Sequence, residues 1–175
     1  MRKMLLAALL MSTVGLLSAL WIPAVNATKP TDVEGYFDYY YAITGMREAD
    51  GNTFLYATEW ETWEGDFEGT AEAVFRVGIF SSGFWNVWLR SEFTGTVDGK
   101  SGTLVIQLVG KKPLDEDWHG QWVIISGTGE LANLHGRGTW WGPGYEDYNA
   151  NGEPDAGDVP GAREDIWYSG KIHFD

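Results

Sequence analysis

An acidic segment near the end of the chain places oxygen ligands at the spacing of a calcium-binding loop. Such a loop takes ligands from its positions 1, 3, 5, 7, 9 and 12, with glycine at position 6 for a sharp turn. In the segment 147–158, Gly152 occupies position 6. Because calcium prefers six to eight hard oxygen ligands, the segment predicts a structural Ca²⁺ ion. The ligand positions hold Asp147, Asn149, Asn151, Glu153 through its main-chain carbonyl, Asp155 and Asp158.

The last ligand position of this loop is Asp158 rather than the bidentate glutamate of calcium sensors. In this respect the segment resembles the EF-hand-like calcium loops of dockerins and other secreted proteins. Asn, Gly, Asp and Pro are also the residues of ordinary turns, so an acidic solvated loop is the alternative. The segment falls within one long connection, 143–163. Bound calcium would order a loop of that length.

The first 27 residues have the three parts of a secretory signal peptide. Arg2 and Lys3 give a basic start, 4–20 is an apolar run, and 25–27 is a small-residue cleavage site. The expected mature chain, 28–175, has the size of a single domain. We therefore expect a protein that is secreted, in the periplasm or outside the cell, without membrane contact after cleavage. An uncleaved apolar run that serves as a membrane anchor is the alternative.

Composition limits the partners of the mature chain. The formal net charge is −13, and loss of the two basic residues of the signal peptide takes it to −15. This charge argues against nucleic acid and anionic membranes as partners, because phosphate neutralisation requires a basic patch. The chain has no cysteine, so its core and its calcium, rather than disulfides, are expected to stabilise it. An aromatic content of 15% and 23 glycines favour a β-rich domain with many tight turns.

Alternation of apolar and polar residues dominates the mature chain, and no long amphipathic helix pattern appears. Glycine-containing turns separate the alternating runs. Eight strands are expected, over residues 33–45, 52–64, 68–79, 84–96, 102–111, 119–127, 135–142 and 164–174. Short connections between them predict an all-β, eight-stranded antiparallel barrel, and a two-sheet sandwich is the alternative. The interior is expected to bury Phe75, Val77, Leu89, Ile106, Ile124, Ile166 and Phe174.

Three glycine-rich segments, 63–70, 93–102 and 126–138, follow one another in a recognisable order. The run Ser126-Gly-Thr-Gly-Glu-Leu131 is the most specific part. Over residues 60–142 the chain resembles a small bacterial family of unknown function. The fold of that family is similar to the allene oxide cyclase-like, calycin-like β-barrel. The resemblance implies an eight-stranded barrel and carries no activity with it.

The sequence supports no catalytic residue. It contains neither a cysteine nucleophile nor a Gly-x-Ser-x-Gly elbow. The histidines His119, His135 and His173 are scattered without the spacing of zinc ligands. His173 shares a strand face with Lys171, so we expect it to be solvated.

Paired carboxylates are the stronger enzymatic signal. Glu59 and Glu61 lie two residues apart in an aromatic-rich strand. Secreted glycosidases use two carboxylates in an aromatic cleft. Spacing by two is also typical of a solvated strand surface, so we expect an acidic outer face, with acid–base catalysis as the alternative. Glu64, Asp66 and Glu68 extend this acidic set.

Tryptophan is unusually frequent, with 10 residues. Neighbours in a strand such as Trp140 and Trp141 must point to opposite faces, so at least one lies outside the core or at its rim. Exposed flat rings stack on sugars or on ring-bearing ligands. The alternative is that rings fill the interior of a small barrel. The tryptophans expected to include a ligand-binding group are Trp63, Trp88, Trp140, Trp141 and Trp167.

Together these features predict a secreted, calcium-stabilised β-barrel that binds a carbohydrate or a small apolar ligand without catalysis. One alternative is an enzyme, either an isomerase or cyclase that acts inside the barrel or a carbohydrate-active hydrolase. The other is a carbohydrate-binding module. A hollow interior lined by rings and one buried carboxylate would favour the enzyme. A filled interior with a flat row of outer tryptophans would favour carbohydrate binding.

Calcium is expected to raise the melting temperature, because a ligand that binds only the native state stabilises it by mass action. Asp147→Ala should abolish most of this gain, since it removes the first ligand of the segment. Thermal unfolding in calcium and in excess chelator measures both effects. Superimposable melting curves for the unmodified protein under the two conditions would contradict the prediction.

Overall fold

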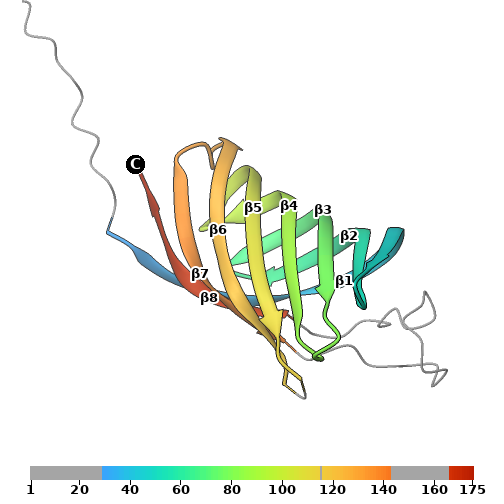
Figure 1. Ribbon diagram of the computed structural model, residues 1–175. Helices are drawn as coiled ribbons and strands as arrows, with labels where there is room; N and C mark the ends of the chain where they lie inside the picture. Colours follow the sequence, from blue (N-terminus) through green and yellow to red (C-terminus); the bar gives the residue numbers. More distant parts are fainter. Residues whose placement is uncertain (1–28, 115, 143–165) are drawn as a thin grey trace, which may run out of the picture.

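The computed structural model describes residues 29–114, 116–142 and 166–175, which form eight strands closed into a barrel (Figure 1). Each strand pairs antiparallel with the next, and β8 pairs antiparallel with β1. The predicted all-β fold of eight antiparallel strands is confirmed, and the sandwich is wrong because β1 and β8 pair and close the sheet. The strands are β1 (Thr31–Ala49), β2 (Asn52–Gly65), β3 (Phe67–Ile79), β4 (Trp85–Val97), β5 (Lys100–Lys112), β6 (Trp118–Gly129), β7 (Leu134–Gly142) and β8 (Ile166–Phe174).

The strand boundaries differ from the predicted ones most in β1. A bulge between Ile43 and Gly45 shifts the register without ending the strand, so β1 continues to Ala49. The hairpin to β2 then turns through Asp50 and Gly51, whose φ angles are 52° and 75°. Two successive positive φ angles match the right-handed twist of the strands and favour Asp-Gly.

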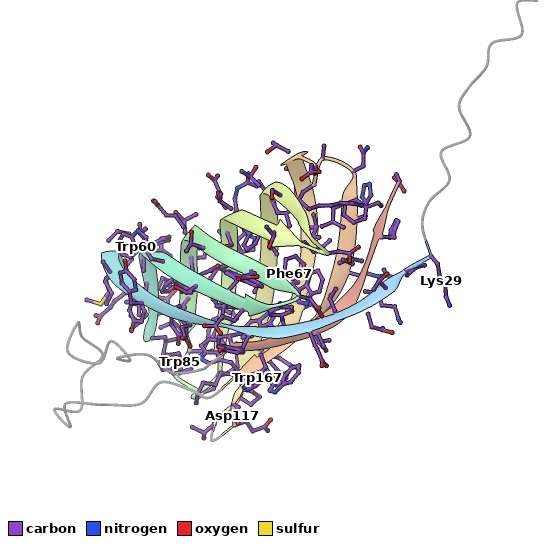
Figure 2. All side chains as sticks on the ribbon, turned by 180° about the vertical axis from the view of Figure 1, so that it is seen from behind. Lys29, Trp60, Phe67, Trp85, Asp117 and Trp167 are labelled. Atoms are coloured by element: carbon purple, nitrogen blue, oxygen red, sulfur yellow. The ribbon has the colours of Figure 1, made fainter. Side chains whose placement is uncertain are left out.

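One end of the barrel interior is filled by aromatic rings. Trp63, Phe67, Phe93 and Tyr168 are fully buried there. The centroid of the Tyr168 ring lies 5.1 Å from that of Trp63 and 5.3 Å from that of Phe67. Leu131, from the β6–β7 turn, is also fully buried. We call this part of the interior the packed end, and the Phe67 label in Figure 2 lies within it.

The Tyr168 hydroxyl ties β8 to the β2–β3 turn at the packed end. It accepts a hydrogen bond from the Phe67 amide at 2.9 Å and donates one to the Glu64 carbonyl at 3.4 Å. Burial raises the pKa of Tyr168, so the hydroxyl stays protonated and can donate. Gly35 on β1 makes room for it, since a Cβ there would lie 2.4 Å from the hydroxyl oxygen.

The opposite end of the interior is less tightly closed among the described residues. Here the inward-facing side chains of Tyr39, Tyr41, Leu55, Phe75 and Val87 are only partly buried. The β1–β2 and β3–β4 hairpins lie at this end, which we call the open end (Figure 1).

The predicted core is confirmed at Val77, Leu89, Ile106, Ile124 and Ile166, all of which are buried. It is wrong at two positions, since Phe75 and Phe174 pack against the core but stay partly exposed. Phe174 is the last residue of β8, whereas Phe75 is level with Ala57 and Leu89 and packs against the partly exposed Tyr41 ring.

Two predicted segments, the signal peptide 1–27 and the calcium segment 147–158, lie outside the described residues and stay predictions. Over the described ranges, no helix has the length and apolar character needed to cross a membrane.

Tyr168→Phe should lower the free energy of unfolding by about 1–3 kcal/mol, because it leaves the buried Phe67 amide without its acceptor. Tyr40→Phe is the matched control, since the Tyr40 ring is exposed on the outer face. Urea unfolding of the two variants measures the difference. Equal losses in both would contradict a structural role for the Tyr168 hydroxyl.

Candidate functional site

Two carboxyl groups lie inside the barrel. Glu59 and Glu61, on β2, are 5% and 3% exposed. The expected acidic outer face is therefore wrong for this pair. Residues two apart on a strand share a face, so the pair lies on the same face of β2 as Ala57 and Trp63. Ala57 and Trp63 are buried, and the two glutamates therefore also point into the interior. The expectation holds for the remaining members of the acidic set, since Glu64, Asp66 and Glu68 are exposed.

Small residues on the adjacent strand leave space around the pair. Glu59 is paired in register with Ala73 of β3, and Glu61 with Ala71. Because these methyl groups fill little of the interior, Ser91 on β4 reaches across β3 to the Glu61 carboxylate. Ser91 is itself fully buried.

The two oxygens of Glu61 differ in their partners. Oε2 accepts hydrogen bonds from Ser91 Oγ and from Trp63 Nε1, both at 2.6 Å. Oε1 is buried and receives no hydrogen bond from a hydroxyl or N–H group of the described residues, which leaves the Glu59 carboxyl as the further partner within the pair. A buried acceptor without a donor costs about 1–3 kcal/mol, so such a group in a native protein calls for an explanation.

The electrostatic environment makes both carboxyls harder to ionise, and Glu59 more so than Glu61. Burial raises the pKa of Glu59 well above its ordinary value, and the charge of Glu61 and a side-chain hydrogen bond to it raise the pKa further. Burial also raises the pKa of Glu61, but the hydrogen bonds from Ser91, Trp63 and Glu59 oppose the rise. Both shifts favour a pair that keeps a proton as the pH rises, with Glu59 the harder of the two to ionise.

Aromatic rings line the interior between the pair and the open end. Tyr39 and Tyr41 of β1 are paired in register with Glu61 and Glu59. The ring of Tyr41 meets that of Phe75 edge-on, with centroids 5.5 Å apart. The two glutamates thus lie level with the partly exposed rings of β1 and next to the fully packed end.

Two of the five predicted ligand-binding tryptophans lie inside the barrel rather than on its surface. Trp63 and Trp140 are buried, so neither is an exposed ring of the predicted set, and ligand binding by them stays a prediction. Trp63 instead belongs to the interior site, through its hydrogen bond to Glu61. The Trp140 indole donates to the Val109 carbonyl at 3.1 Å.

The other three predicted tryptophans face outward. Trp141 and Trp167 are exposed and are paired in register across β7 and β8. The expectation that one ring of the 140–141 pair is exposed is thus confirmed. Trp88 lies on β4, away from both, with the Arg76 guanidinium 5.1 Å from its ring centroid.

The fold brings together two histidines that the sequence separates. His135 and His173 are partners across β7 and β8, with ring centroids 5.4 Å apart. Their Nε2 atoms lie 3.0 Å and 3.7 Å from the Asp175 carboxylate. His173 is therefore stacked and paired, not simply solvated as predicted. Among the described residues, no group of three or more His, Asp or Glu side chains could hold a metal ion.

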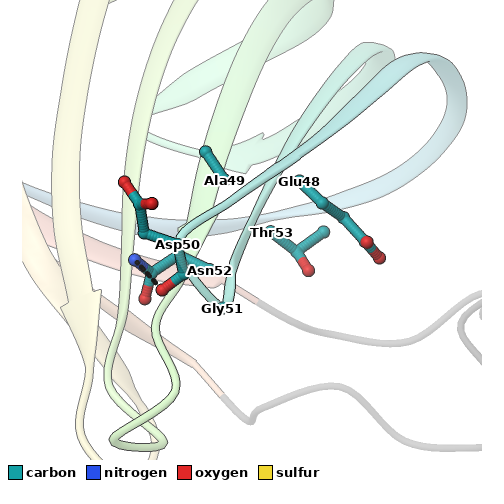
Figure 3. Close-up of a pocket in the computed structure, with 6 residues that line it drawn as sticks. All are labelled: Glu48, Ala49, Asp50, Gly51, Asn52 and Thr53. Atoms are coloured by element: carbon teal, nitrogen blue, oxygen red, sulfur yellow. Dashed lines mark hydrogen bonds between the residues drawn. The ribbon is translucent and has the colours of Figure 1, made fainter.

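A shallow hollow also lies at the tip of the β1–β2 hairpin (Figure 3). Residues 48–53 line it, and the Asn52 amide donates to the Asp50 carbonyl at 3.4 Å. The lining comes from one hairpin alone and contains neither buried carboxyls nor aromatic rings. The interior pair is therefore the stronger candidate site.

Comparison with known proteins identifies a family and a fold. A family model described as "Protein of unknown function (DUF3224)" matches residues 42–143. The crystal structure of a DUF3224 protein with unknown function from Shewanella oneidensis MR-1 is similar, with a TM-score of 0.63 and 18% identity. The similarity covers 84% of this chain and 98% of that one. No curated protein matches. The predicted resemblance to a family of unknown function is confirmed, and the likeness to the allene oxide cyclase barrel stays a prediction.

Glu59→Gln should make the protein more stable at neutral pH. A carboxyl whose pKa is raised in the native protein is protonated in both the native and the unfolded protein at low pH. Above the unfolded pKa of about 4.3, only the native state keeps the proton. The free energy of unfolding therefore falls as the pH rises from the unfolded-state pKa to the native-state pKa of Glu59, by up to about 1.4 kcal/mol per pH unit.

Urea unfolding between pH 4 and pH 8 measures this slope. Glu59→Gln should flatten it, whereas Glu72→Gln, on the exposed face of β3, should leave it unchanged. An unaltered slope in Glu59→Gln would show that the proton is not held there.

Proposed function

The chain belongs to the DUF3224 family of proteins of unknown function, and we propose that it binds a small, mainly apolar ligand at the Glu59–Glu61 pair inside its barrel. One observation carries the proposal. The Glu59 and Glu61 carboxyls are buried side by side in the interior, and Oε1 of Glu61 receives no hydrogen bond from a hydroxyl or N–H group of the described residues. The native state tolerates this pair at a cost, and a ligand that donates to Glu61 would offset part of that cost.

The chemistry of the pair defines the class of ligand. An ionised carboxylate in an apolar interior favours an N–H or O–H donor, and a protonated amine adds charge pairing. The rings of Tyr41 and Phe75 supply apolar contact on the same side of the pair. A ring-bearing amine satisfies both requirements. A carboxylate of the same shape would be repelled by Glu61.

Entry from the open end is the shortest route to the pair. Side chains there are partly exposed, whereas the rings of the packed end exclude a ligand. Tyr39 and Tyr41 lie along this route, level with the two glutamates.

Acid–base catalysis on the bound ligand is the second candidate function. It is favoured by the presence of one protonated and one more acidic carboxyl in direct contact. Glu61 would take a proton from one ligand atom and return a proton to another, as in an isomerisation that needs no further reactant. Glycoside hydrolysis fits poorly, because its two carboxyls stand roughly 5 Å or more apart to flank the scissile bond. Glu59 and Glu61 instead hydrogen-bond to each other.

The proposal keeps the secreted, calcium-stabilised setting that the sequence predicts. The support for secretion is the composition of residues 1–27. The support for calcium is the ligand spacing of residues 147–158. Neither is required for ligand binding at the interior pair.

Three probes of one shape test the ligand class: 2-phenylethylamine, 2-phenylethanol and phenylacetate. We expect the amine to bind most tightly and phenylacetate least, by isothermal titration calorimetry at neutral pH. Glu61→Gln should weaken amine binding about tenfold or more, which corresponds to about 1.4 kcal/mol. The surface variant Glu72→Gln should bind like the unmodified protein.

Equal binding of phenylacetate and the amine would contradict the assigned role of Glu61. So would an amine affinity that Glu61→Gln leaves unchanged. Intrinsic tryptophan fluorescence gives an independent readout, because the Trp63 indole hydrogen-bonds to Glu61 and should respond to a ligand at the pair.

A further inference from the structure

A row of aromatic rings crosses the outside of the barrel on β7, β8 and β1. Trp141, Trp167 and Tyr36 are successive partners in register across these strands. Trp141 and Trp167 are 45% and 47% exposed, and the Tyr36 ring lies 5.4 Å from that of Trp167. Since neighbouring strands lie about 4.8 Å apart, the row spans roughly 10 Å. We call these three residues the aromatic row, and Trp167 is labelled in Figure 2.

A row of polar side chains runs beside the aromatic row on the same strands. Residues two apart on a strand share a face, so each polar residue lies next to a ring. The Thr139 and Ser169 hydroxyl oxygens are 3.5 Å apart. We call this the polar row, and its members, successive partners across β6, β7, β8 and β1, are Gln121, Thr139, Ser169 and Glu34.

Polar groups also stand at both ends of the aromatic row. The Tyr36 hydroxyl donates to the Glu64 carboxylate on β2 at 2.5 Å. At the other end, His119 of β6 is paired in register with Trp141. The rings are thus bordered on three sides by hydroxyl, amide, carboxylate and imidazole groups.

We propose that the aromatic and polar rows together bind a neutral oligosaccharide. Ring faces stack on the apolar C–H faces of sugars, while hydroxyl, amide and carboxylate groups bind sugar hydroxyls. The adjoining pattern of the two rows matches the two kinds of surface that a sugar ring presents. This site lies on the outer face of the wall and does not involve the interior glutamates.

Charge selects a neutral glycan over other occupants. Glu34 and Glu64 border the rings, and the whole chain carries a net charge of −13. Arg137 and Lys171 lie beyond the polar row on the same face, and Lys171 forms an ion pair with Asp32. The acidic groups beside the rings would repel uronic acids, sulfated sugars and nucleic acids stacked there. A protein partner fits less well, because the cores of protein interfaces are depleted in acidic side chains and serine.

Trp88 provides a matched control, because it is an outward tryptophan on β4, away from both rows. Arg76, rather than another aromatic ring, stacks on it. If any outer tryptophan sufficed for sugar binding, Trp88 would contribute as much as Trp167.

The test is calorimetric titration of the purified protein with cellohexaose, mannohexaose and oligogalacturonate. We expect at least one of the neutral hexasaccharides to bind, and oligogalacturonate to bind at least tenfold more weakly. Trp141→Ala and Trp167→Ala should each weaken neutral binding at least tenfold. Trp88→Ala and the interior variant Glu61→Gln should change the affinity for the neutral hexasaccharide by less than twofold. Melting temperatures and Trp167→Leu, which keeps an apolar side chain, separate loss of stacking from loss of folding.

Several results would overturn the proposal. One is the failure of both neutral hexasaccharides to bind, and another is equal binding of oligogalacturonate. A third is an equal loss of affinity for the neutral hexasaccharide in Trp88→Ala and Trp167→Ala. The last is a change of sedimentation from oligomer to monomer in Trp167→Ala, which would identify the row as a contact between copies of this chain.

Discussion

The pairing of β8 with β1 is the constraint on which the rest of this structure depends. It converts a sheet of eight strands into a ring, so that every second side chain of each strand must enter one shared interior. The interior is narrow, and large rings from β2, β3, β4 and β8 fill the packed end. The Tyr168 hydroxyl satisfies the main chain of the β2–β3 turn at that end. The two glutamates are buried next to this end, on the side of the partly exposed rings of β1 and β3.

A carboxyl pair in such an interior costs stability, and the surroundings offset only part of that cost. Ser91 and Trp63 satisfy one oxygen of Glu61, and alanines on β3 leave the room for them. The proton on Glu59 avoids the burial of two adjacent negative charges. The other oxygen of Glu61 receives no hydrogen bond from a hydroxyl or N–H group of the described residues. Buried groups arranged at a cost to the fold are more typical of binding or catalysis than of structure.

The outer wall uses the same alternation for a different surface. Outward positions of β7, β8 and β1 carry rings in one row and hydroxyl, amide and carboxylate groups in the next. Each strand contributes one ring and one polar group to this surface, so neither row is visible as a contiguous motif. The interior and outer sites share strands β1 and β2 but present opposite faces of them. A ligand at one need not disturb the other.

Local alternation and turn residues determined the strand order, the antiparallel pairing of neighbours and most of the core, because both signals act between residues close in the chain. They also showed that Glu59 and Glu61 share a face. Only the tertiary structure decided that this face turns inward, since the ring closes around Ala57 and Trp63 on the same side. Only the tertiary structure brought His135 next to His173 and placed Trp141, Trp167 and Tyr36 in one row. These contacts depend on the register between β7 and β8 and between β8 and β1, which are separated in sequence. Spacing along a strand specifies which side chains lie together on a face, whereas closure of the sheet specifies which face water reaches.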